Sequence, residues 1–191
     1  MKRISVKNLQ KAYGKQKVLT GVTFTATDER ITCIMAPSGV GKTTLLRILL
    51  GLEQPDGGTV SLPRNCRWAA VFQEDRLLEQ LDAMENLRFV LGNELDEGDA
   101  GALLRELGLE EPAGKPVRDF SGGMKRRVAL ARALLAPSDA LALDEPFAGL
   151  DEENRGRAIA CIRERTAGKP VFLVTHDEGD AIDLGARVIH L

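Results

Sequence analysis

The sequence predicts an α/β fold in one domain, with a mainly parallel β-sheet core, an antiparallel β-region near the N-terminus and a helical subdomain inserted at about residues 75–135. Short apolar strands alternate with helical patterns along most of the chain, which is typical of a parallel sheet. The segment 4–24 instead alternates apolar and polar residues, and the middle third carries helical patterns. A length of 191 residues, with no repeat or linker, favours a single domain spanning residues 1–191.

The N-terminal region is predicted to be a pair of antiparallel strands. Segments 4–6 and 18–24 alternate apolar and polar residues, and Gly14 lies in the turn between them, where it supplies flexibility. Residues 31–35 are a short, continuous apolar run, which indicates a buried strand.

A helix is predicted from Lys42 onward. The leucines between 45 and 50 form one apolar face, and Gly51 is placed to end the helix. After a turn rich in glycine and proline, residues 59–62 and 68–72 are predicted to be two further strands.

The middle of the chain is predicted to be helical. Residues 84–91 and 101–109 have amphipathic patterns, and an acidic stretch at 94–99 separates them. Acidic residues near a helix start usually form a solvated surface that complements the helix dipole, so we assign this stretch no binding function.

The last third returns to alternating helices and strands. A helix that ends near residue 135 precedes a strand at 140–143, and a helix at 152–165 precedes a strand at 171–174. A final strand is predicted at 187–191, and no regulatory domain is expected beyond it.

Composition excludes several classes of protein. The net charge is −2 and both signs are interspersed, which argues against a basic nucleic-acid surface. Cys33, Cys66 and Cys161 are isolated and odd in number, so reduced thiols in a cytoplasmic protein are expected. Neither a secretory signal nor an apolar run long enough to cross a bilayer is present, so a function at a membrane would require a second chain as anchor.

The residues at 36–43 read APSGVGKT, which matches the phosphate-binding P-loop except that Ala36 replaces the first glycine. Glycine lets the amides of Gly39 and Gly41 approach phosphate oxygens, and the following helix N-terminus adds a favourable dipole. Lys42 is expected to reach the β- and γ-phosphates, and Thr43 to offer its hydroxyl to Mg²⁺. The alternative is a glycine-rich turn that binds nothing. If the first position requires a positive φ, alanine is strained there.

Two acids follow the predicted strand at 140–143. Asp144 is expected to complete the Mg²⁺ shell, as strand-end aspartates do in P-loop enzymes, and Glu145 to act as general base on the attacking water. Without the P-loop, such a pair would more often be a helix cap.

The run FSGGM at 120–124, together with the P-loop and the strand-end acids in this order, resembles the nucleotide-binding subunits of ABC transporters over nearly the whole chain. The resemblance implies a P-loop NTPase fold with a RecA-like core. In that family this run, called the signature, contacts the γ-phosphate held by a second subunit in a head-to-tail dimer. The resemblance implies this role for Ser121, Gly122 and Gly123. A serine and two glycine amides at a helix start can bind an anion, or can be a plain helix cap. Met124 replaces the family's glutamine.

Further positions are assigned by the same resemblance. It implies that Tyr13 stacks on adenine, that Gln73 contacts Mg²⁺ and couples to the transmembrane partner, and that His176 contacts the γ-phosphate. Asp151 is implied to be the acid of a loop that communicates across the dimer. The catalytic residues are then Lys42, Glu145 and His176. Further ATP contacts are implied for Ser38, Val40 and Thr44.

The function implied is an ATP-binding and ATP-hydrolysing subunit, a homodimer on the inner face of the cell membrane, that drives solute import through a separate permease. The SGGMKRR run and the compact middle segment resemble importers of nitrate or sulfonates. The alternatives are export, lipid-release, cell-division and DNA-maintenance complexes, or a regulatory module without hydrolysis; stacking does not distinguish ATP from GTP. Lys125, Arg126 and Arg127 are expected to be a solvated helix face, not a nucleic-acid surface.

Overall fold

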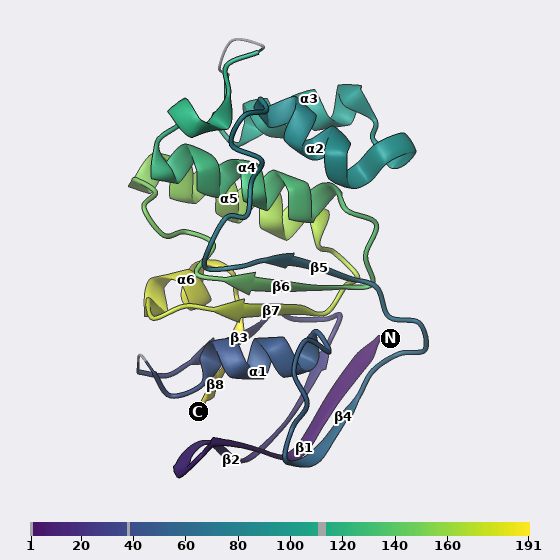
Figure 1. The fold of residues 1–191 in the computed structure, drawn as a ribbon, viewed down its shortest axis with the longest axis vertical. Helices are drawn as coiled ribbons and strands as arrows, with labels where there is room; N and C mark the ends of the chain where they lie inside the picture. The colour runs from purple at the N-terminus through teal and green to yellow at the C-terminus, as the bar shows by residue number, and fades with distance from the viewer. Residues whose placement is uncertain (1, 38, 111–113) are drawn as a thin grey trace. The chain divides into compact units, whose positions relative to one another are not determined.

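The computed structural model describes residues 2–37, 39–110 and 114–191 (Figure 1). The chain divides into two compact units. The sheet unit comprises the residues up to Ala70 together with Ser138–Asp144 and Ala167–Leu191, and the helical unit comprises Val71–Pro137 and Glu145–Thr166. Each is described by itself below.

The larger sheet has five strands in the order β5-β6-β7-β3-β8. Its pairs β3–β7, β3–β8 and β6–β7 are parallel, which confirms the predicted mainly parallel core. The strands are β3 (Thr32–Met35), β5 (Trp68–Val71), β6 (Ala140–Asp144), β7 (Val171–Val174) and β8 (Arg187–His190). All residues of β3, β6 and β7 are buried, which explains their continuous apolar runs.

The second sheet is antiparallel and has the order β2-β1-β4. Its strands are β1 (Arg3–Tyr13), β2 (Gln16–Thr27) and β4 (Gly57–Ser61). The hairpin between β1 and β2 is the one predicted, and Gly14 turns it with a φ of 60°. The predicted strand after the glycine–proline turn is β4, which pairs with β1.

The core of the sheet unit joins both sheets to α1 (Lys42–Leu49). Phe172 of β7 lies at its centre, 6.1 Å from Phe24 and 5.6 Å from Trp68 between ring centroids. Gly51, with a φ of 71°, ends α1 as predicted, because its amide donates to the carbonyl of Ile48 in the manner of a Schellman cap. The short helix α6 (Glu178–Asp183), which the sequence did not predict, completes this unit.

The helical unit is built around α4, which packs against α2, α3 and α5 (Figure 1). The helices are α2 (Ala83–Leu91), α3 (Glu97–Glu106), α4 (Gly122–Leu135) and α5 (Glu152–Arg165), with 3-10 turns at Gly92–Glu94 and Val117–Asp119. In the part of the chain that the structure describes, none of the helices combines the length and apolarity needed to cross a bilayer.

The predicted helix at 101–109 begins earlier than the sequence indicated. Asp96 accepts a hydrogen bond from the amide of Asp99 and so caps α3, which ends at Glu106 before Gly108 takes a φ of 67°. Asp96, Glu97 and Asp99 of the acidic stretch are therefore the cap and first turn of this helix, where they complement its dipole.

Candidate functional site

The P-loop follows β3 and leads into α1 in the sheet unit. Gly39 and Gly41 have φ values of 82° and 107°, and Gly41 is the N-cap of α1. A Cβ on Gly41 would lie 2.5 Å from Cγ1 of Val18, so this position combines a left-handed backbone with a close approach to β2. Only glycine fits here without strain.

The Lys42 side chain folds back over its own loop. Its Nζ donates hydrogen bonds to the carbonyls of Ala36, at 2.6 Å, and Pro37, at 3.2 Å. Among the described residues, positive φ at a non-glycine position occurs at Asn8, Asn65, Arg76 and Glu145. Ala36 is not one of them, so alanine at the first P-loop position causes no strain of this kind.

Thr43 joins the P-loop to the strand-end carboxylate. Its hydroxyl donates to Oδ2 of Asp144 across 3.3 Å, and Asp144, at the end of β6, is only 4% exposed. A hydroxyl and a carboxylate are oxygen ligands of the kind that Mg²⁺ prefers, usually completed by phosphate and water. In the described ranges no cluster of three or more His, Cys, Asp or Glu could hold a metal, so a Mg²⁺ here would depend on the nucleotide for most of its ligands.

Three parts of the predicted site lie at one edge of the parallel sheet. Because β3, β6 and β7 are parallel neighbours, the P-loop after β3, Asp144 at the end of β6 and His176 after β7 leave the sheet at its carboxyl edge. Ligands of open α/β sheets bind at this edge. His176 is exposed there.

The remaining predicted residues of the sheet unit lie around this edge and on the hairpin. Val40 precedes Gly41 in the loop and Thr44 lies in the first turn of α1, whereas Ser38 lies outside the described residues. Tyr13 ends β1 with 47% of its surface exposed, and its hydroxyl donates to the carboxylate of Glu53. That hydrogen bond lowers the pKa of Glu53 and fixes one end of an otherwise accessible ring.

In the helical unit, Ser121 is the N-cap of α4, and its Oγ accepts a hydrogen bond from the amide of Met124 at 3.2 Å. Ser121 and Gly122 are exposed. A Cβ on Gly123 would lie 2.7 Å from the carbonyl oxygen of Gly149, which accounts for a glycine at this position. The serine is therefore a helix cap, and Gly122, the first residue of α4, is exposed beside it; a helix N-terminus of this kind can bind an anion.

Glu145 and Gln73 belong to the helical unit as well. Glu145 has a φ of 50°, an uncommon conformation for a residue with a side chain, and its carbonyl accepts from the amide of Ala148 at 3.1 Å. Such strain is typical of functional positions. Gln73 is exposed, and its carbonyl accepts from Arg126 at 2.9 Å.

The family described as "ABC transporter" matches residues 19–148 of this chain. The chain belongs to this family. An "Aliphatic sulfonates import ATP-binding protein SsuB 2" of Paraburkholderia xenovorans is 40% identical over 97% of this chain and 75% of its own length. The SsuB 1 protein of Nocardia farcinica is also 40% identical, over 98% of this chain and 77% of its own length.

Two solved structures share this ABC ATPase fold. An "ATP binding subunit of ABC transporter" superposes with a TM-score of 0.86 and 29% identity, covering 98% of this chain and 85% of that one. A bacterial Atm1-family ABC exporter with ATP bound gives a TM-score of 0.85 over 37% of its length, at 20% identity, a likeness in fold alone. The predicted family, fold class and ATPase activity are confirmed: this is an ATP-binding, ATP-hydrolysing subunit of the ABC transporter type.

The expectation of a solvated basic face on α4 is wrong. We call α4 the signature helix, because it begins at the signature residues 121–123. Arg126 and Arg127 are only 5% and 7% exposed, because backbone carbonyls of other segments surround their guanidinium groups. Lys125 is partly exposed and pairs with Glu79 at 3.2 Å.

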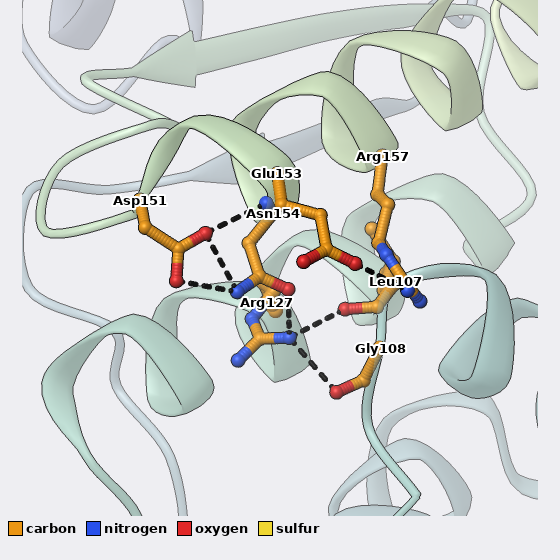
Figure 2. A network of polar contacts seen from close by, with 7 residues as sticks. All are labelled: Leu107, Gly108, Arg127, Asp151, Glu153, Asn154 and Arg157. Carbon is orange, nitrogen blue, oxygen red and sulfur yellow. Dashed lines mark hydrogen bonds and ion pairs between the residues drawn. The ribbon is translucent and has the colours of Figure 1, made fainter.

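Figure 2 shows the network around Arg127. Its Nη1 donates to the carbonyls of Leu107 and Gly108, at 2.7 and 2.9 Å, and to Oδ1 of Asn154 at 2.6 Å. Asn154 in turn donates from its backbone amide to Asp151, the N-cap of α5, at 2.8 Å (Figure 2). This hydrogen bond lowers the pKa of Asp151. Arg127 therefore ties the signature helix to the start of α5, a link that no sequence pattern indicated.

Proposed function

We propose that this protein energises the import of aliphatic sulfonates, or of small anions related to them, through a separate transmembrane permease at the inner face of the cell membrane. Relatives with 40% identity over nearly the whole chain are named sulfonate import ATP-binding proteins. The solute would be recognised by the permease and any external binding protein, and this chain would supply the ATPase.

The hydrogen bond between Thr43 and Asp144 carries the proposal for the nucleotide site. It brings the first turn of the P-loop helix to a buried carboxylate at the carboxyl edge of the sheet. When ATP binds, Lys42 would release the loop carbonyls and donate instead to the β- and γ-phosphate oxygens. The amides of Gly39 and Gly41 would donate to the same phosphates.

Thr43 and Asp144 would hold Mg²⁺ with the phosphates, and Gln73 would contribute a further oxygen. The bound ion would neutralise charge on the β- and γ-phosphates. His176 would donate a hydrogen bond to the γ-phosphate, and Tyr13 would stack on the adenine.

Glu145 would act on the attacking water. The water oxygen forms a bond to the γ-phosphorus, and the bond from that phosphorus to the bridging oxygen breaks, so ADP leaves with the electron pair. The water proton passes to the Glu145 carboxylate, which acts as general base.

Two copies would assemble head-to-tail, with Ser121, Gly122 and Gly123 of one copy at the γ-phosphate held by the other. A cap serine and the N-terminal amides of a helix suit an oxyanion. Each P-loop would then be half of a site, and activity would require the dimer.

Nucleotide turnover tests the roles in the nucleotide site. Lys42→Ala should lose ATP binding and turnover, whereas Glu145→Gln should bind ATP but turn it over at least about a hundredfold more slowly, within the range of a lost general base. Lys7→Ala and Glu164→Gln change exposed residues of the same types and should retain the wild-type rate. Wild-type rates in both site variants would rule out this mechanism.

Mixing variants tests the dimer. Lys42→Ala and Ser121→Asp proteins should each be inactive, but a mixed dimer contains one site with both halves intact. An equimolar mixture should therefore recover about one quarter of the wild-type rate when sites act independently, because half of the dimers are mixed and each has one good site of two. A mixture as inactive as its components would contradict the head-to-tail arrangement.

Uptake tests the transport role. A strain that lacks the gene should lose uptake of a labelled alkanesulfonate, and the wild-type chain should restore it where Lys42→Ala does not. Undiminished uptake in the deleted strain would rule out sulfonate import.

A further inference from the structure

The segment that contains Gln73 is held by the signature helix through buried arginine side chains. We call residues 72–76, which follow β5 without forming a helix or strand, the glutamine loop. Nη1 of Arg126 donates to the carbonyl of Phe72 at 2.5 Å, and its Nη2 donates to the carbonyl of Gln73 at 2.9 Å. One guanidinium thus binds the two backbone carbonyls that precede and follow the Cα atom of Gln73.

A carboxylate of the same loop lies against Arg126. Oδ1 of Asp75 is 3.0 Å from Nη1 of Arg126, close enough for an ion pair, but it is buried and makes no well-directed hydrogen bond. Burial raises the pKa of Asp75, and the nearby charges of Arg126 and Arg132 oppose that rise.

A second arginine holds the far end of the glutamine loop. Arg132 of α4 donates from Nη1 to the carbonyl of Arg76 and from Nη2 to the carbonyl of Asp75, both at 2.8 Å. The Arg76 guanidinium lies 4.0 Å from the ring centre of Phe72, which draws the two ends of the loop together. Four carbonyls of this short loop therefore accept from one helix.

The helix that holds the loop is also the signature helix. Ser121 caps α4, and Arg126 and Arg132 lie about 1.4 and about 3 turns beyond it. The helix that begins at Ser121 therefore also binds the carbonyls of the glutamine loop.

We propose that Arg126 is a positioning residue for Gln73: it holds the backbone of the glutamine loop so that the exposed Gln73 side chain is presented to the metal. The inference rests on the proposed role of Gln73 as a Mg²⁺ ligand. Arg126 acts through Gln73 and touches neither nucleotide nor metal.

The Mg²⁺ dependence of ATP turnover tests this proposal. Arg126→Gln should raise the Mg²⁺ concentration for half-maximal turnover about tenfold, a usual effect of losing a residue that orients a metal ligand. ATP affinity measured in EDTA should not change. Lys125→Gln removes the same charge from the neighbouring position, whose partner is Glu79, and should leave the Mg²⁺ dependence unchanged.

A double-mutant cycle separates positioning from a general structural effect. Gln73→Ala should shift the Mg²⁺ dependence as Arg126→Gln does, and the double variant should resemble Gln73→Ala alone. Additive shifts, or no shift in Arg126→Gln when Gln73→Ala has one, would overturn the positioning role and leave the proposed function intact. No shift in Gln73→Ala would overturn both the inference and the proposed metal role of Gln73.

A conservative variant covers the case in which Arg126→Gln fails to fold. Arg126→Lys retains the charge, but a single ammonium group cannot span the carbonyls of Phe72 and Gln73 as a guanidinium does. It should fold and still raise the Mg²⁺ requirement. A wild-type Mg²⁺ requirement in Arg126→Lys would show that charge alone suffices and would overturn the proposal.

Discussion

Replacing Gly41 with alanine tests the geometry of the P-loop without any nucleotide. Gly41 has a φ of 107°, and an added Cβ would lie 2.5 Å from Cγ1 of Val18 and 3.1 Å from the Val18 carbonyl oxygen. Val18 is β-branched and its carbonyl is part of β2, so neither atom can move aside easily.

The expected cost has two parts. An alanine held at such a φ costs about 1–3 kcal/mol, and the forced contact with β2 costs about 1–3 kcal/mol more. Gly39→Ala is the matched control, because its φ of 82° imposes the backbone strain while a Cβ there meets nothing within 4 Å. The difference between the two variants is the contact, about 2 kcal/mol, or roughly 6 °C in unfolding temperature for a chain of this size.

Fluorescence of the single tryptophan provides the assay. The ring centroids of Trp68 and Phe172 are 5.6 Å apart in the sheet unit, which also contains Gly41. Tryptophan fluorescence during thermal unfolding without ATP or Mg²⁺ therefore reports on the unit that carries the substitution. Both variants should unfold below the wild type, and Gly41→Ala should unfold lowest. Equal unfolding temperatures for Gly41→Ala and Gly39→Ala would show that the close approach to β2 does not exist.

Three further predictions concern the rest of the molecule. Because burial raises the folded-state pKa of Asp75, the folded chain keeps this proton to higher pH than the unfolded chain, and the contribution of Asp75 to stability should fall as pH rises above 3.8; urea unfolding from pH 4 to 7 should show the free energy of unfolding of Asp75→Asn rising relative to that of the wild type as pH increases, and a difference that does not change with pH would contradict the assignment. Cys66 should react with iodoacetamide before Cys161, since burial raises the pKa of both thiols, that of Cys161 to about 11, and Cys66 is the less buried of the two; peptide mass mapping with the reverse order would contradict this. Ser121→Ala should lose about 1 kcal/mol of stability in thermal unfolding with the cap of α4, and Ser121→Thr should restore it; equal stability of the two would argue against the cap.

The sequence predicts most of the sheet unit because its signals are local. Strand β7 has the predicted bounds, and α5 begins directly after Asp151, a capping residue that the sequence makes visible. The P-loop is equally local: a buried strand, two glycines that need positive φ and a helix follow one another without interruption. Each step depends on neighbours in the chain, so each could be predicted.

The displaced and missed helices show where local signals fail. Gly98 and Gly101 weaken the helical pattern at the start of α3, so the prediction placed the helix further along, while the Asp96 cap set the actual start. Helix α6 has only 6 residues and too short a pattern to detect.

The arginines of α4 could not be predicted because their partners are distant in sequence. Arg126 contacts carbonyls more than fifty residues earlier in the chain, and Arg127 contacts carbonyls about twenty residues earlier. A run of basic residues has the same composition whether its charges face water or the interior. Only the tertiary arrangement distinguishes the two.

The buried arginines also explain how loops without regular structure keep a fixed shape. Residues 72–76 and 107–108 lie outside the sheets, so no neighbouring strand supplies donors to their backbone carbonyls. A guanidinium has five donors, so Arg126, Arg127 and Arg132 each bind two or more carbonyls. A leucine at these positions would remove those donors, and the loss would cost most at the Leu107 carbonyl, whose hydrogen bond to Arg127 is buried. The glutamine loop and the start of α5 thus take their positions from one helix, and that helix begins at the signature.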